Sequence, residues 1–310
     1  SFGQDPDSVT VGEMSSTSIG ACVEYTRPEN RELSMVFNFH HLKVDYASGR
    51  KWTLMDPDIP ALKRLLNDWS LGLQDGGGWN ALFWNNHDQP RAIDRFGDAD
   101  RFRYESATML ATAIHLMRGT PYVYMGEEIG MSDPGYTTIE DYVDIEARNA
   151  FAELVAAGHE ADEAFRIVHS KARDNARTPM QWDASASAGF TDGVPWLRPT
   201  NQDEVNVAHE EASGRILPYY RRLIVLRKSV PVISGGAYEP YAFDDPDIMA
   251  YVRHDEEHRL LVVCSFRGHE TGIDLPTDFL GGEVLISNYP LRSLRERMSL
   301  RPYEALALLV

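Results

Sequence analysis

Short apolar runs alternate with segments of helical spacing over residues 9–125 of the chain. Apolar residues recur at intervals of three and four in two segments, which predicts helices over 60–71 and 104–117. Four further runs have the length of strands and are bounded by polar residues, Gly or Pro. These predicted strands span 9–12, 33–39, 81–84 and 122–125. Strands and helices that alternate at such intervals are typical of parallel strands joined by crossover helices.

The alternation of predicted strands and helices is interrupted over 126–215. A mostly polar helix is expected over 141–166. The segment 173–198 is rich in Trp, Pro, Asp and Gly and is expected to form a long loop of the kind that often carries function. We therefore treat 126–215 as an insertion after the fourth strand.

The last part of the chain has a different pattern. A helix is expected over 216–228, and short alternating runs separated by Gly, Asp and Pro follow from Val232 onward. Such runs predict a small antiparallel β domain. The predicted domains are thus 1–230, which contains the insertion, and 231–310.

Four parallel strands do not close a barrel by themselves. A barrel of this type needs eight, and half of one leaves two unpaired edges. The chain also begins with Ser1-Phe-Gly-Gln4, without Met, a few residues before the first predicted strand. We expect the remaining strands to lie upstream in a longer polypeptide.

Composition narrows the class of partner. The formal net charge of −17 disfavours nucleic acids and anionic membranes, and no apolar run is long enough to cross a bilayer. Cys22 and Cys264 lack the spacing of a metal site or a disulfide framework, which favours a reducing, cytoplasmic location. Small neutral ligands are expected, and no cofactor is.

Two carboxylates follow predicted strands directly. Glu13 comes after the first strand, and Asp88 ends the sequence Asn-Asn-His-Asp after the third. Carboxylates at the carboxyl ends of buried parallel strands point into the crevice that binds ligands. Gly12 would leave room for a ligand, and partial burial could keep Glu13 protonated. Such a pair suits glycoside cleavage, although a helix cap or an Arg pair is the simpler role for either acid.

Three histidines also follow strands. Adjacent residues on an extended segment point to opposite sides, so His40 and His41 are expected to pack or face solvent rather than to bind a metal. His87, beside Asp88, is placed to bond a substrate hydroxyl.

Other charged groups have ordinary interpretations. Glu127 and Glu128 could be catalytic, but holding a loop through backbone amides or Arg side chains is favoured. Asp94 and Arg95 are expected to form a surface pair.

Four segments resemble the later motifs of the α-amylase superfamily, glycoside hydrolase family 13, and most closely its oligo-1,6-glucosidase and α-glucosidase branch. They are Val11-Gly-Glu-Met14, Phe83-Trp-Asn-Asn-His-Asp-Gln-Pro-Arg91, Arg118-Gly-Thr-Pro-Tyr-Val-Tyr-Met-Gly-Glu-Glu-Ile-Gly130 and Arg173-Asp-Asn-Ala-Arg-Thr-Pro-Met-Gln-Trp-Asp183. The resemblance implies an α/β fold, namely the second half of a (β/α)8 TIM barrel (strands 5 to 8) followed by a small antiparallel β-sandwich. It also implies that Glu13 is the general acid/base and Asp88 the transition-state stabiliser, and that Asn86, His87 and Arg173 bind the sugar.

One expected motif is absent. The nucleophilic Asp of these retaining enzymes lies in a Gly-Phe-Arg-x-Asp pattern, which the sequence does not contain. Because double displacement requires a nucleophile, we expect no turnover from this chain alone. The missing N-terminal half, or a second copy, is the expected protein partner.

The implied function is a retaining α-glucosidase acting on short α-linked gluco-oligosaccharides. Oligo-1,6-glucosidase is the first choice, and an α-1,4-glucosidase or dextran glucosidase is the alternative. Sucrose isomerases carry an Arg-rich loop where this chain has Lys43-Val-Asp-Tyr46, which disfavours isomerisation. Non-catalytic members, such as transporter heavy-chain ectodomains, are disfavoured because Glu13 and Asp88 are both present, and a module that only binds sugar is a third alternative.

Overall fold

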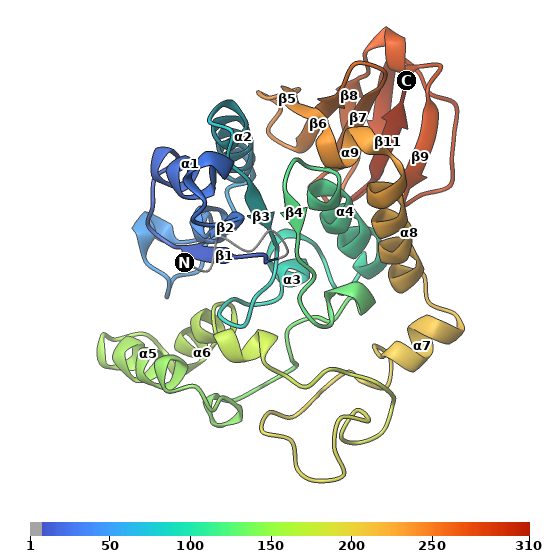
Figure 1. Cartoon of the computed structure of the whole chain (residues 1–310). Coiled ribbons are helices and arrows are strands. Elements are labelled where there is room, and N and C mark those ends of the chain that lie inside the picture. Colours follow the sequence, from blue (N-terminus) through green and yellow to red (C-terminus); the bar gives the residue numbers. More distant parts are fainter. Residues whose placement is uncertain (1–7) are drawn as a thin grey trace.

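A parallel sheet forms the first part of the computed structural model, which describes residues 8–310 (Figure 1). Its strand order is β1-β2-β3-β4, and each neighbouring pair is parallel. The strands are β1 (Val11–Met14), β2 (Met35–Asn38), β3 (Asn80–Leu82) and β4 (Thr120–Pro121). The helices between them are α1 (Ile19–Thr26), α2 (Ile59–Asp75), α3 (Ala92–Phe96) and α4 (Arg103–His115). The observations drawn from Ser1–Gln4 fall outside the described residues.

Helix α2 shows how local sequence sets these elements. The Asp58 side chain caps its first turn by accepting a hydrogen bond from the Ala61 amide at 2.8 Å, and Pro60 occupies the first turn, where no amide hydrogen is needed. The residues that face the sheet are buried. They are Leu62, Leu66, Trp69 and Leu73. The helix is thus the predicted one, extended by a turn at its C-terminal end.

The fourth strand was predicted in the wrong place. It is Thr120–Pro121, and the apolar run 122–125 lies outside the sheet. The last sheet-like hydrogen bond here is donated by the Tyr122 amide to Leu82 O at 2.7 Å. The run is apolar because Tyr122, Val123 and Tyr124 line a pocket, as described below.

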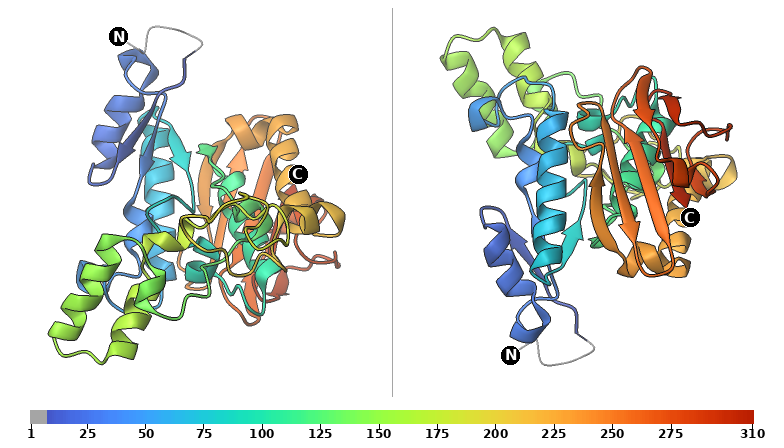
Figure 2. Two further views of the ribbon diagram at one scale, coloured as in Figure 1. Left: turned by 90° about the horizontal axis from the view of Figure 1, so that it is seen from below. Right: turned by 90° about the horizontal axis from the view of Figure 1, so that it is seen from above.

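The insertion contains two helices, α5 (Ile145–Ala156) and α6 (Ala161–His169), in place of the single predicted helix. Gly158, at φ 100°, supports the turn between them. This hairpin lies at the opposite end of the molecule from the antiparallel sheet (Figures 1 and 2). The short helix α7 (Val207–Ala212) ends the insertion. The predicted loop over 173–198 begins with a 3-10 helix, Arg173–Ala176, and is otherwise without helix or strand up to residue 206.

The C-terminal part is antiparallel. Helices α8 (Ile216–Ser229) and α9 (Pro231–Gly235) precede a five-stranded sheet of order β5-β6-β7-β11-β9 and a two-stranded sheet of β8 and β10. The strands are β5 (Ala237–Tyr241), β6 (Ile248–His254), β7 (Arg259–Ser265), β8 (Thr271–Asp274), β9 (Glu283–Ser287), β10 (Arg297–Leu300) and β11 (Ala305–Leu309). One face of the larger sheet shares a buried core with α2, α4 and α8. The other face packs against the two-stranded sheet.

Short 3-10 helices complete the chain. They are η2 (Pro28–Asn30), η3 (His40–Lys43), η4 (Ala47–Gly49), η5 (Glu127–Ile129), η6 (Ile139–Asp141), η7 (Arg173–Ala176) and η8 (Thr277–Phe279). Cys22 and Cys264 are free and buried. Within residues 8–310, no helix combines the length and apolarity needed to cross a bilayer.

Candidate active site

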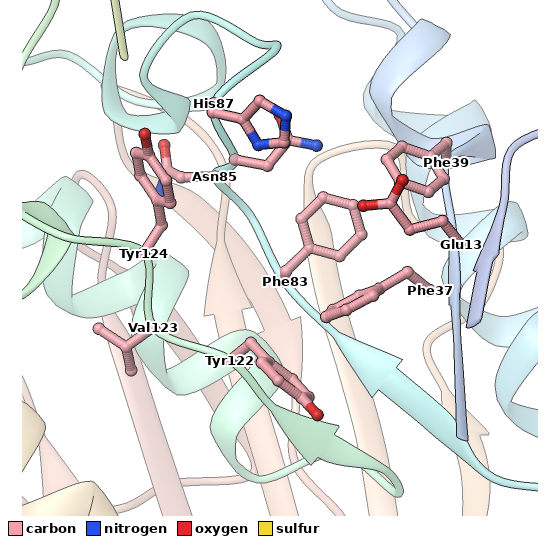
Figure 3. A pocket seen from close by; sticks show the side chains of 10 residues that line it. Glu13, Phe37, Phe39, Phe83, Asn85, His87, Tyr122, Val123 and Tyr124 are labelled. Atoms are coloured by element: carbon pink, nitrogen blue, oxygen red, sulfur yellow. The ribbon is translucent and has the colours of Figure 1, made fainter. Parts of the chain in front are cut away.

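A pocket of about 210 Å³ lies beyond the carboxyl ends of all four parallel strands (Figure 3). Glu13 enters it from β1, Asn85, Asn86 and His87 from the segment after β3, and Tyr122 to Tyr124 from the segment after β4. Aromatic rings form its floor, with Phe37 and Phe83 in edge contact at 5.1 Å between centroids. The pocket therefore combines an apolar surface with a few convergent polar groups, as small-molecule sites do.

The Glu13 carboxyl group points toward the Phe39 and Phe83 rings (Figure 3). Glu13 is exposed, so the partial burial expected from the sequence is not found. The reason is topological, since β1 ends the sheet order and is paired only with β2 in the described part of the chain.

The absence of a side chain at Gly12 allows close packing of Leu33 and does not open space for a ligand. A Cβ atom there would lie 2.6 Å from Leu33 Cδ1 and 3.5 Å from Val36 Cγ1. Because successive strand residues point to opposite faces, Gly12 faces these side chains while Glu13 faces the pocket. The expectation that Gly12 makes room for a ligand is wrong.

Asp88 lies beside the pocket in a cluster of charges. Its Oδ1 accepts a hydrogen bond from Arg177 Nη2 at 2.7 Å and lies 3.6 Å from Arg173 Nη1. Its Oδ2 lies 3.4 Å from His87 Nε2, and its amide donates to Asn86 Oδ1 at 2.9 Å. The structure thus brings Asp88, His87, Asn86 and Arg173 together, while Glu13, Asn86 and His87 share the pocket lining.

Arg173 is held mainly by Asp144. Its Nε and Nη2 donate to the two Asp144 oxygens at 2.7 and 2.8 Å, and this hydrogen bonding raises the pKa of Arg173. The geometry is the bidentate fork that fixes an Arg in orientation. Asp144 aims Arg173 toward Asp88, a role not foreseen from the sequence.

Arg177 is a second site residue that the sequence analysis did not identify. It donates to His87 O at 2.6 Å as well as to Asp88, so one side chain fixes both ends of the His-Asp pair. Its position within the 173–183 motif was the available signal. Two arginines, not one, therefore surround the proposed stabilising carboxylate.

Glu127 and Glu128 have different roles. Glu128 accepts a hydrogen bond from the Gly126 amide at 2.8 Å, which matches the predicted role of holding a loop. Glu127 is buried, and Asn85 Nδ2 donates to its Oε2 at 2.5 Å. Burial, reinforced by the charge of Glu128, raises the pKa of Glu127 to about 8. The neutral acid beneath Asn85 thus supports one wall of the pocket.

His41 packs in the core, in agreement with the prediction. Its Nε2 lies 3.0 Å from Phe83 O, and its ring makes an edge contact with Phe83. Burial lowers the pKa of His41 to about 4, so the ring is neutral at physiological pH. Among residues 8–310, no group of three or more His, Cys, Asp or Glu residues is arranged to hold a metal ion.

Arg95 is buried, so the predicted surface pair with Asp94 is wrong. Arg95 Nη2 and Nε donate to Asp45 Oδ1 and Oδ2 at 2.7 and 3.1 Å. Its neighbours on α3, Ile93 and Phe96, are buried in the core and turn this face of the helix inward. Asp94 instead accepts a hydrogen bond from the Asp133 amide.

Comparison with known families agrees with the four sequence motifs. The model of the α-amylase catalytic domain matches residues 1–236, and that of the α-amylase SusG C-terminal domain matches residues 248–306. The chain belongs to the α-amylase family, glycoside hydrolase family 13. The resemblance inferred from the sequence is confirmed, and the mixed helices and sheets are those of an α-amylase-like fold.

Two names recur among the most similar relatives in this family. Trehalose-6-phosphate hydrolase of Bacillus subtilis is 47% identical over 97% of this chain and 54% of its own length. Oligo-1,6-glucosidase of Halalkalibacterium halodurans is 44% identical over 97% of this chain and 55% of its own length. The crystal structure of Bacillus licheniformis trehalose-6-phosphate hydrolase superposes with a TM-score of 0.94 at 46% identity, covering 98% of this chain and 56% of that one. The chain therefore spans about half the length of the relatives it matches.

Proposed function

We propose that this chain supplies the acid/base side of the active site of a retaining α-glucosidase that acts on short α-linked glucosides. In this proposal Glu13 is the general acid/base and Asp88 the transition-state stabiliser, and Asn86, His87 and Arg173 bind the sugar. The supporting observation is the pocket itself, where Glu13 faces His87 and Asn86 across aromatic rings, with Asp88 bound to His87 and two arginines.

The chemistry follows from these positions. Glu13 protonates the leaving oxygen, and the Asp88 carboxylate stabilises the positive charge of the oxocarbenium-like transition state. The Asn86 amide and the His87 imidazole have N–H donors for sugar hydroxyls, while Phe37 and Phe83 offer an apolar surface to the ring.

We propose the architecture that the four sequence motifs imply. The four parallel strands correspond to strands 5 to 8 of a (β/α)8 barrel, within a domain over 1–230, and 231–310 form a β-sandwich. The nucleophile pattern Gly-Phe-Arg-x-Asp is absent from the 310 residues, so we expect them not to turn over alone. The protein partner that completes the site would add strands beside β1 or β4.

An oligo-1,6-glucosidase activity is our first choice of substrate, with α-1,4-glucosidase or dextran glucosidase as the alternative. Named oligo-1,6-glucosidases at 40 to 44% identity support this choice, and an α-glucosidase of Pediococcus pentosaceus is 40% identical. The cytoplasm remains the proposed location, because both cysteines are free.

A second candidate is hydrolysis of a 6-phosphorylated disaccharide such as trehalose 6-phosphate. The observation that favours it is Lys43, an exposed cation four residues after the pocket residue Phe39, which has no ion pair among residues 8–310. An ammonium without an ion pair, four residues along the chain from a pocket residue, suits a phosphate. The trehalose-6-phosphate hydrolases at 45 and 47% identity support the same substrate.

Hydrolysis of isomaltose, maltose and trehalose 6-phosphate by the full-length gene product tests these proposals. Preference for isomaltose supports the first choice. Preference for trehalose 6-phosphate, with a higher KM in Lys43→Ala but an unchanged KM for isomaltose, supports the second. Absence of hydrolysis of all three would contradict both and would favour a non-catalytic member of the family. Lys228→Ala, a cation of α8 outside the pocket lining, is the matched control.

A further inference from the structure

One buried carboxylate, Asp45, binds two cations. Arg95 donates to both of its oxygens, and Lys171 Nζ donates to Asp45 Oδ2 at 2.6 Å and to Asp45 O at 3.1 Å. The side chains of Asp45, Arg95 and Lys171 are each only 4% exposed. We call these three residues the Asp45 network.

The two cations come from two different segments, one that follows Asp88 in the sequence and one that carries the arginines bound to Asp88. Arg95 lies on α3, which begins four residues after Asp88, and its Nη1 donates to Gln89 Oε1 at 3.1 Å. Lys171 lies two residues before Arg173, at the start of the segment that carries both arginines facing Asp88. Asp45 itself lies beyond β2. The carboxylate thus ties the Asp88 segment and the arginine segment to a common point.

The arginine segment has other anchors. Arg177 binds Asp88 and His87 O directly, and Arg91 Nη2 donates to Ala176 O at 3.4 Å. Further bonds hold the segment to the insertion or to the loop after β4. Asp174 Oδ2 accepts hydrogen bonds from the Val143 and Asp144 amides at 2.9 and 2.8 Å. Ala176 O accepts from Tyr124 Oη at 3.0 Å. The bond from Lys171 adds a separate link, which runs to the loop after β2 and, through Arg95, to Gln89 beside Asp88.

We propose that Asp45 is a positioning residue that sets the distance between Asp88 and the arginines at 173 and 177. The catalytic consequence rests on the proposed function, but the positioning itself does not. Buried charges lose hydration on folding, so each partner binds strongly to the others and a lost partner leaves an uncompensated charge. Loss of the network would therefore leave the arginine segment held to the Asp88 segment only by the contacts of Arg173, Arg177 and Arg91, and its position would be less firmly fixed. Displacements of about 1 Å in a catalytic constellation cost on the order of 100-fold in rate.

Two variants separate positioning from stability. Lys171→Met keeps the one-to-one pair of Asp45 and Arg95, so the protein should fold. Asp45→Asn removes the common anchor. Tyr251→Phe is the matched control, because it deletes a buried hydrogen bond to Ala113 O, at 3.0 Å, on a strand that does not line the pocket.

Hydrogen–deuterium exchange on the 310-residue chain provides the first readout. In Lys171→Met we expect exchange to rise about tenfold over 86–91 and 172–177, with the amides of β6, β7 and β11 unchanged. Tyr251→Phe should instead raise exchange near β6. Unchanged exchange over 86–91 and 172–177 in both network variants, or an equal rise throughout the chain, would overturn the proposal.

Kinetics of the full-length gene product provide the second readout. We expect kcat to fall about tenfold in Lys171→Met and about 100-fold in Asp45→Asn, at temperatures where both remain folded. KM should change much less, and Lys171→Arg should restore most of kcat. If the unsubstituted product hydrolyses no glucoside, the proposed function fails, and the exchange result still decides whether Asp45 positions the two segments. A kcat that stays at the level of Tyr251→Phe would refute the catalytic consequence.

Discussion

Replacing Glu127 by Gln should change how the stability of the protein depends on pH. Burial raises the pKa of this carboxyl from 4.5 to about 8, so the folded state holds a proton that the unfolded state releases over this range. The folded state therefore loses stability as pH rises from about 4.5 through 8. At 1.36 kcal/mol per pKa unit, the loss is on the order of 4 kcal/mol.

Glu127→Gln removes this titration at little structural cost. The amide oxygen can still accept the hydrogen bond from Asn85, and the amide nitrogen takes the place of the second carboxyl oxygen, near Tyr220. Near pH 5 the variant should match the unsubstituted protein within about 1 to 2 kcal/mol. By pH 8 the variant should be more stable than the unsubstituted protein by a few kcal/mol, because it lacks the loss of stability that accompanies the raised pKa of Glu127.

The assay is urea unfolding at pH 5, 6, 7 and 8 for both proteins, analysed as the difference between them so that other carboxylates cancel. Glu128→Gln is the matched control, because Glu128 is its less buried neighbour and should leave most of the slope in place. A difference between the proteins that stays constant from pH 5 to pH 8 would refute the reasoning, since it would mean that Glu127 is ionised throughout.

Three further outcomes are expected. Arg177→Ala should lower kcat/KM of the full-length product by roughly 10- to 100-fold, because Asp88 and His87 O lose a charged donor, and steady-state kinetics measure this. Gly12→Ala should cost about 1 to 3 kcal/mol in thermal unfolding through overpacking against Leu33, without raising KM. His41→Gln should reduce the loss of stability that accompanies acidification from about pH 6.5 to 4, since the low pKa of buried His41 disfavours protonation of the folded state.

Local pattern predicted most of the fold. Three of the four parallel strands and helices α2, α4 and α8 follow from their apolar runs and end signals, because α2 and α8 bury one face in the core while α4 and β3 are buried along most of their length. The prediction of a strand over 122–125 was wrong because the apolar side chains of this run line a pocket outside the sheet. Apolar residues at a binding surface and in a strand have the same pattern.

Contacts between segments that are distant in the chain could not be predicted from the sequence. Arg95 meets Asp45 from 50 positions away, and spacing along the chain gives no sign of such a pair. The exposure of Glu13 depends on what pairs with β1, which is also not a local property. The motifs did identify residues that the structure brings together, namely Asn86, His87, Asp88 and Arg173. They did not indicate the trehalose-6-phosphate hydrolases, which the comparisons place beside the oligo-1,6-glucosidases.

The role of Glu13 is the central claim, and one comparison of substrates tests it most directly. In the full-length product, Glu13→Gln should lower hydrolysis of the preferred disaccharide by roughly 10³-fold, because its leaving group needs a proton. α-Glucosyl fluoride needs none, so the variant should still form the glycosyl-enzyme from it, and added azide should speed turnover and yield α-glucosyl azide. If Glu13→Gln cleaves the disaccharide at the unsubstituted rate, Glu13 is not the general acid and the account is wrong.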